Sequence, residues 1–262
     1  MSFETDKQTL DDLNILGKYK NNSVYSLFGG TVTRGGEHLL EGMFQNPLTD
    51  AEEINKRVAM FRYFKEKDLP FPGTPEECDV VEQYVSGASG KHWIFNLGHL
   101  CQAKFLETVG HDPRYKVWQE QVSSTVEFLS KAFDYLRELV KGMGGHPLEE
   151  RVRQAIALLE KPSFAKILKD KKASLGLQDM FTRDRLFRCV EHKALGDLMT
   201  LFQELDVCTV VGRVARENDF CFPVASAAGE VSMRMEGLHH PCIPGAVSNN
   251  MEITREKNIF FL

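Results

Sequence analysis

Hydrophobic residues recur at intervals of three and four over roughly the first 215 positions, a spacing typical of amphipathic α-helices. The longest such run extends from Arg114 to Met143. At ~1.5 Å per residue, this helix would be about 45 Å long, more than one compact core requires, which predicts a strut or lever. Its apolar positions fit either a core or a surface for a partner chain, and they include Trp118, Leu129, Phe133 and Leu136.

A short helical piece followed by a loop is predicted within residues 1–28, and two longer helices are predicted between it and this run. The first begins at Gly35 and ends before Pro47, because proline cannot continue a helix. The second begins at a capping box of Thr49 and Glu52, in which the hydroxyl and the carboxylate each accept a hydrogen bond from a free backbone N–H.

Two helices are predicted after it, over residues 148–161 and 184–216. The apolar positions of the second of these are Leu186, Val190, Leu198, Leu201, Phe202 and Leu205.

The pattern changes at Phe220, where short β-prone runs begin to alternate with turn residues. We therefore predict a mainly α chain with long helices. A helical domain is expected over residues 1–216, and a small β-containing segment over residues 217–262. The apolar stretch at residues 258–262 is β-prone and runs into the C-terminus, where a bare edge strand would invite aggregation, which raises the question whether a longer protein continues there.

Composition limits the classes of function. The 262 residues carry a formal net charge of −5, which excludes a chain that coats nucleic acid by bulk charge alone but leaves room for a local basic patch. No apolar run approaches the ~18 residues of a membrane span, and no signal peptide is visible. We therefore expect a cytoplasmic protein that does not associate with a membrane. The six cysteines show no C-x-x-C spacing and are expected to be reduced and mostly buried.

Several short motifs follow one another along the chain. The pattern T-x-T-x-x-G-x-x-x-L is matched by Thr31, Thr33, Gly36 and Leu40, and it is followed by Pro47-Leu48 and by Ile54, Arg57, Val58 and Phe61. Later segments are Leu205-Asp206 with Ala215, then "GLHHPCI" and "KNIFFL". In this order they resemble the core domain of MutS-type DNA mismatch-repair ATPases and the opening strands of their ATPase domain.

The resemblance implies a mechanical role. Helical levers would carry nucleotide-driven movement to DNA, the intact parent would use ATP and Mg²⁺, and it would bind double-stranded DNA as a homodimer. In the family, "KNIFFL" precedes the phosphate-binding loop G-x-x-x-x-G-K-[ST], and this chain would stop just before it. "SGASGKHW" at residues 86–93 does not match that loop. We therefore expect no catalytic residue, no cofactor and no ATP hydrolysis in the chain itself.

Two alternatives remain open. The parent would be a MutS-like scaffold that does not read mismatches, since no Phe-x-Glu wedge domain is seen and only residues 142–184 separate the two long helical segments. Otherwise the chain would be a free-standing helical adaptor with its true end at Leu262.

Two groups of candidate site residues follow from the resemblance. The lysines expected at the lever tip, where they would contact DNA phosphates or simply form a solvated helix end, are Lys166, Lys169, Lys171 and Lys172. The residues expected beside a nucleotide are His240, Pro241, Val247 and Asn249.

Residue chemistry suggests two further hypotheses, one about a zinc site and one about Arg34. His239, His240 and Cys242 would need Cys221 or Cys208 to complete a zinc site, and with only one close pair of ligands visible we expect no metal. Arg34 would either hold a phosphate or carboxylate, or pack and cap inside the core.

Overall fold

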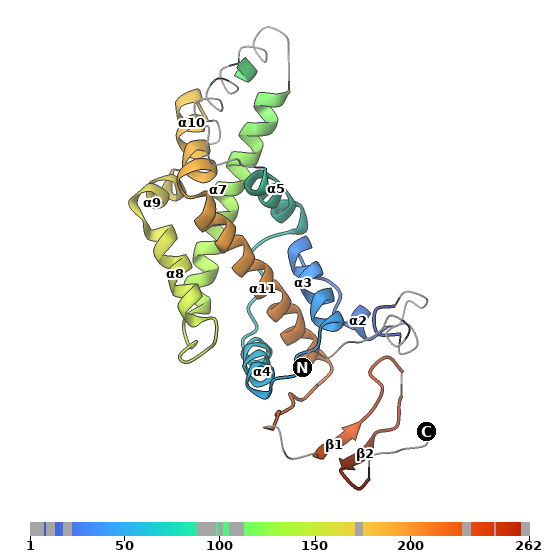
Figure 1. Cartoon of the computed structure of the whole chain (residues 1–262). Helices are drawn as coiled ribbons and strands as arrows, with labels where there is room; N and C mark the ends of the chain where they lie inside the picture. The colour runs from blue at the N-terminus through green and yellow to red at the C-terminus, as the bar shows by residue number, and fades with distance from the viewer. Residues whose placement is uncertain are drawn as a thin grey trace. The chain divides into compact units, whose positions relative to one another are not determined.

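A computed structural model describes residues 8, 14–17, 23–87, 98, 102–104, 113–170, 175–226, 232–243 and 245–257. They are mainly helical, with one two-stranded sheet near the C-terminus, which confirms the predicted fold class (Figure 1). The apolar stretch at 258–262 lies outside the described residues, and so does most of the segment 86–93.

The chain divides into two compact units. The first, here the α7 unit, comprises Thr31–Glu37 and Leu69–Thr209. The second, here the hairpin unit, comprises Met1–Gly30, His38–Asp68 and Val210–Leu262. Two helices, α3 (Arg34–Gln45) and α11 (His192–Glu217), contribute residues to both.

The α7 unit is built around α7 (Arg114–Leu139), the long helix that the sequence predicts. It ends four residues earlier than expected, and Gly142 follows in a left-handed conformation with a φ of 97°. Figure 1 shows shorter helices beside it, and these are α5 (Pro75–Ser86), α8 (Glu149–Glu160), α9 (Pro162–Lys169) and α10 (Leu177–Arg185). Because α7 contacts all four, its apolar face lies in the core of this unit.

Aromatic rings fill much of this core. The Phe202 side chain is fully buried, and its ring lies edge-on to Phe128 and Phe71, with centroids 5.4 and 5.9 Å apart. Phe164 of α9 stacks with Phe187 at 6.1 Å. Edge-to-face and offset contacts of this kind add stability beyond the burial of apolar area.

The helix predicted over 184–216 is interrupted. Residues Leu186–Val190 form a π-helical turn, η1, in which the Glu191 N–H donates to the Leu186 carbonyl at 2.8 Å. Such an i→i+5 turn contains one residue more than an α-turn, so the side chain four positions after Leu186 leaves the buried face. Val190, one of the apolar residues assigned to this helix, is accordingly 60% exposed.

The hairpin unit contains α2 (Val24–Leu27) and α4 (Ala51–Glu66). The N-cap of α4 is Asp50, whose carboxylate accepts from the Glu53 N–H at 3.0 Å. The N-cap is therefore Asp50, one residue after the Thr49 that the sequence predicts as the cap. Aspartate ranks above threonine at this position, in line with the observed choice.

Helices α4 and α11 approach closely within the hairpin unit. A Cβ added at Gly212 would lie 2.5 Å from the carbonyl carbon of Phe64, so only glycine fits at this crossing. The segment that follows α11 is held to α4 as well, because the side-chain amide of Asn55 exchanges two hydrogen bonds with the backbone of Ala225.

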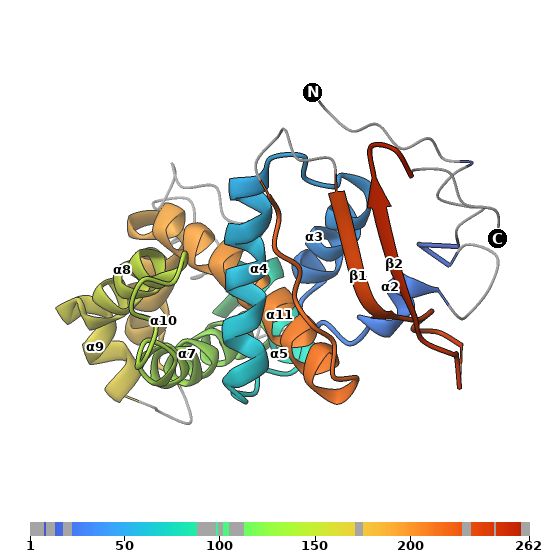
Figure 2. The ribbon, with the colours of Figure 1, turned by 90° about the horizontal axis from the view of Figure 1, so that it is seen from below.

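The two strands, β1 (Ser232–Leu238) and β2 (Asn249–Thr254), form an antiparallel hairpin (Figure 2). Met233 pairs with Ile253 and Met235 with Met251, and the register is irregular between Met235 and Leu238. Strands are thus found within the segment that the sequence assigns to them.

Candidate functional site

Two motif segments that are far apart in the sequence meet in the α7 unit. The Asp206 carboxylate, which is fully buried, accepts hydrogen bonds from the Val32 and Thr33 N–H groups at 2.9 and 2.7 Å. The Thr33 hydroxyl also donates to it, at 2.8 Å. We call this group, Val32, Thr33 and Asp206, the Asp206 junction. A buried carboxylate requires such donors, because an uncompensated charge in the core is very unfavourable.

Glycine at position 36 belongs to the same arrangement. Its N–H donates to the Thr33 hydroxyl oxygen at 3.0 Å, as in a helix N-cap at the start of α3. A Cβ on Gly36 would lie 2.6 Å from that oxygen and 2.8 Å from the Asp206 carboxylate. The predicted motif T-x-T-x-x-G therefore has a physical basis: threonine caps the helix, and glycine leaves room for the carboxylate.

A second buried polar cluster joins α5, α7 and α10. The Asp184 carboxylate accepts from the Tyr84 hydroxyl at 2.7 Å and from the Trp118 indole N–H at 2.9 Å. The Arg188 guanidinium lies over both rings, 5.4 Å from the Tyr84 centroid and 5.7 Å from the Trp118 centroid, and donates to the Gly87 carbonyl at 3.0 Å. Burial, and then the charge of Asp184, raise the pKa of Tyr84 well above its ordinary value, so Tyr84 stays a donor. The sequence patterns gave no sign of this cluster.

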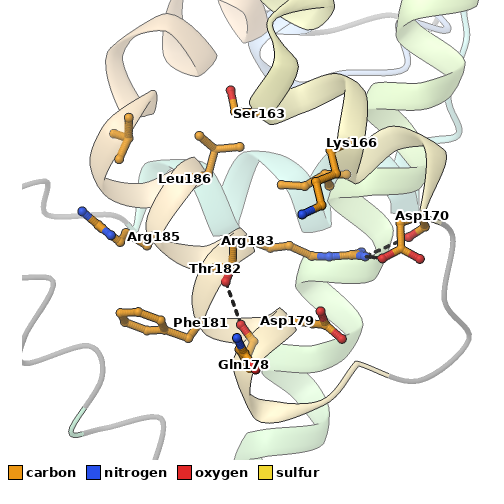
Figure 3. A pocket seen from close by; sticks show the side chains of 12 residues that line it. Ser163, Lys166, Asp170, Gln178, Asp179, Phe181, Thr182, Arg183, Arg185 and Leu186 are labelled. Carbon is orange, nitrogen blue, oxygen red and sulfur yellow. Dashed lines mark hydrogen bonds and ion pairs between the residues drawn. The ribbon is translucent and has the colours of Figure 1, made fainter.

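Of the predicted phosphate-contacting lysines, two are described. Lys166 and Lys169 lie on α9 and are both exposed, whereas Lys171 and Lys172 lie outside the described residues. Lys166 lines a cavity of about 570 Å³ between α9 and α10, and Lys169 does not (Figure 3). The lysines are therefore not equivalent.

The residues predicted beside a nucleotide all lie in the hairpin unit. The His240 ring accepts from the Cys242 N–H at 3.2 Å, and the Asn249 amide donates to the Val247 carbonyl at 3.3 Å. Val247 is 80% exposed. Pro241 lines a separate cavity of about 890 Å³ with residues 219–224 and 234–239.

In the described part of the chain, no three His, Cys, Asp or Glu side chains gather as a metal site would require. Cys208, one proposed partner of the His239–Cys242 segment, is buried in α11, and burial raises the pKa of its thiol. Thiolates, not thiols, bind zinc, so Cys208 is a poor ligand.

Arg34 is exposed at the start of α3, and its guanidinium pairs with the Asp79 carboxylate at 2.6 Å. The interpretation that Arg34 packs inside the core is therefore wrong, and its role as a carboxylate partner is filled by a residue of the same chain. Among the described helices, none combines the length and apolar character needed to cross a bilayer.

Comparison of the chain with protein-family models finds no match, and a search of curated proteins finds none either.

Proposed function

We propose that this chain is the core and lever region of a MutS-like DNA mismatch-repair ATPase, and that it couples ATP-driven movement to DNA binding without catalysing a reaction itself. The observation that carries the proposal is the Asp206 junction. The two segments whose residues resemble the family motifs, Thr31–Gly36 and Leu205-Asp206, are 173 positions apart at their Thr33–Asp206 contact and bond to each other there.

The long helices support the same role. Both α7 and α11 contain 26 residues, and each would be about 39 Å long at ~1.5 Å per residue. Asp206 lies within α11 and is hydrogen-bonded to Thr33. A displacement of this helix would therefore move Thr33 and the start of α3, or break the hydrogen bond between Asp206 and Thr33. A rigid element tied to a second segment in this way is what mechanical coupling between two sites requires.

A second candidate is a MutS-like scaffold that binds DNA structures or proteins without reading mismatches. The observation that favours it is the region between the long helices. Its described part contains the short helices α8, α9 and α10, all of which contact α7, and the turn η1, whose Phe187 stacks with Phe164 of α9. This is a compact cap, and an arm that crosses DNA would be expected to extend away from the core.

Mismatch discrimination separates the two candidates. The protein should be purified as its own cells make it, and its affinity measured by fluorescence anisotropy for a paired 30-base-pair duplex and for the same duplex with one mismatch. The first candidate predicts tighter binding to the mismatched duplex and an increased spontaneous mutation rate when the gene is deleted. Equal affinities with an unchanged mutation rate support the scaffold.

Substitutions in α11 test whether the Asp206 junction is needed for the proposed function. In the deletion strain, a gene carrying Asp206→Ala should fail to restore the mutation rate, whereas Asp197→Ala should restore it, because Asp197 is an exposed residue of the same helix. An unchanged mutation rate together with no duplex binding would contradict both candidates.

A further inference from the structure

One cavity of the α7 unit combines charge with apolar surface. It has a volume of about 570 Å³ and lies between α9, α10 and η1 (Figure 3). Pockets for small organic ligands measure roughly 300–1,000 Å³, so its size is within that range. Its apolar lining is provided by Ile167, Phe181, Leu186 and Val190.

Arg183 provides a buried positive charge in the lining. The residue is 4% exposed, and one Nη atom of its guanidinium donates to the Asp170 carbonyl at 2.8 Å and lies 3.6 Å from the Asp170 carboxylate. A guanidinium has five N–H donors. Asp170 engages one of its Nη atoms, and Arg183 is itself one of the residues that line the cavity.

Lys166 supplies a second cation. It lines the same cavity, and Figure 3 shows its side chain turned towards that of Arg183. Within the described part of the chain its ammonium makes no ion pair with a carboxylate. The remaining charged lining residues are Arg185, Asp170 and Asp179, so the cations outnumber the carboxylates by three to two.

We propose that this cavity binds a small organic anion, with a carboxylate or phosphate group on a short apolar body. The oxyanion would accept hydrogen bonds from Arg183 and Lys166, and the apolar body would lie against Ile167, Leu186 and Val190. A pre-positioned arginine favours such a ligand because Asp170 already fixes its orientation, and charge-assisted hydrogen bonds are the strong ones. Binding of such an anion does not depend on the function proposed above.

Calorimetric titration of the full chain with octyl phosphate, octanoate, octanol and inorganic phosphate tests both halves of the ligand. We expect an octyl anion to bind at least about tenfold more tightly than octanol, which lacks the charge, and than phosphate, which lacks the apolar body. Tighter binding of octyl phosphate assigns the head group as a phosphate, and tighter binding of octanoate assigns it as a carboxylate.

Variants locate the binding. Lys166→Met should weaken binding of the preferred anion about tenfold, while Lys169→Met, a change of the same kind on the same helix but outside the lining, should leave it within about twofold. Val190→Asp, at a side chain 60% exposed and therefore tolerant of change, should abolish binding by placing a carboxylate at the cavity. Lack of binding by either octyl anion at millimolar concentration would overturn the proposal, as would equal affinity for octanol or equal losses in the two lysine variants.

Discussion

The Thr33 hydroxyl has two partners at once: it donates to the Asp206 carboxylate at 2.8 Å and accepts from the Gly36 N–H at 3.0 Å. A single side chain therefore caps the start of α3 and joins it to the middle of α11. Thr33 is 2% exposed and Asp206 is completely buried, so water cannot replace either bond.

Replacing Asp206 by alanine should destabilise the protein strongly. Two backbone N–H groups and one hydroxyl would lose their acceptor, and each unsatisfied buried donor costs ~1–3 kcal/mol. We expect the free energy of unfolding, measured by urea denaturation followed by circular dichroism, to fall by about 3 kcal/mol or more. Asp197→Ala, at an exposed position of the same helix, should change it by less than about 0.5 kcal/mol. Equal effects of the two substitutions would contradict the role given to the junction.

Two glycines of α3 should respond in opposite directions to replacement by alanine. A Cβ at Gly36 would lie 2.6 Å from the Thr33 hydroxyl oxygen, so Gly36→Ala should break the cap and lower stability by about 1–3 kcal/mol. At Gly42 a Cβ meets no atom of the described residues within 4 Å, so Gly42→Ala should raise stability by up to about 1 kcal/mol through helix propensity. Thermal unfolding of both variants checks the sign, and a stabilising Gly36→Ala would show that the junction adapts.

The helices could be predicted because their apolar spacing is regular. The sequence located α7 and α8 to within a few residues, since buried side chains such as Val122 and Leu136 repeat at helical intervals. The π-helical turn at Leu186–Val190 could not be predicted, because one extra residue in a turn leaves the local apolar composition unchanged.

The polar clusters differ in how far the sequence revealed them. Asp206 and Thr33 were each identified through motif resemblance, but their contact could not be derived, since nothing local relates positions 173 apart. The bonds of Asp184 to Tyr84 and Trp118 were missed because a carboxylate within a helical segment usually faces solvent. The Arg183 side chain was missed for the same reason, as arginine is seldom buried.

Stability should fall at alkaline pH partly through Cys78. Burial, followed by the charge of Asp206, raises the pKa of the Cys78 thiol from 9.0 to about 12. Because the pKa is higher in the folded state, the stabilisation is complete below pH ~9 and is lost as pH rises from ~9 towards ~12. Between pH 9 and 10 the loss from this group should be about 1 kcal/mol.

Urea unfolding at pH 7.5, 9 and 10 measures this loss. In Cys78→Ala, the free energy of unfolding should fall less steeply between pH 9 and 10. The cavity that the substitution creates should lower stability at every pH, which leaves this slope as the informative quantity. An identical slope in the variant would mean that the Cys78 thiol is not the group responsible.

Duplex DNA should bind this chain weakly and through Lys169 more than through Lys166. The net charge is −5, and Lys166 lines the cavity, whereas Lys169 is exposed at the end of α9 outside the lining. Nonspecific affinities lie at ~10⁻⁴–10⁻⁶ M at physiological salt, and each lysine that contacts a phosphate contributes about one to the slope of log K against log salt. Anisotropy titrations between 50 and 200 mM salt should therefore show a slope about one smaller in magnitude for Lys169→Gln, and an unchanged slope for Lys56→Gln, at an exposed lysine of α4. Tight binding that resists salt, or equal losses at Lys56 and Lys169, would place the DNA contact elsewhere on the protein.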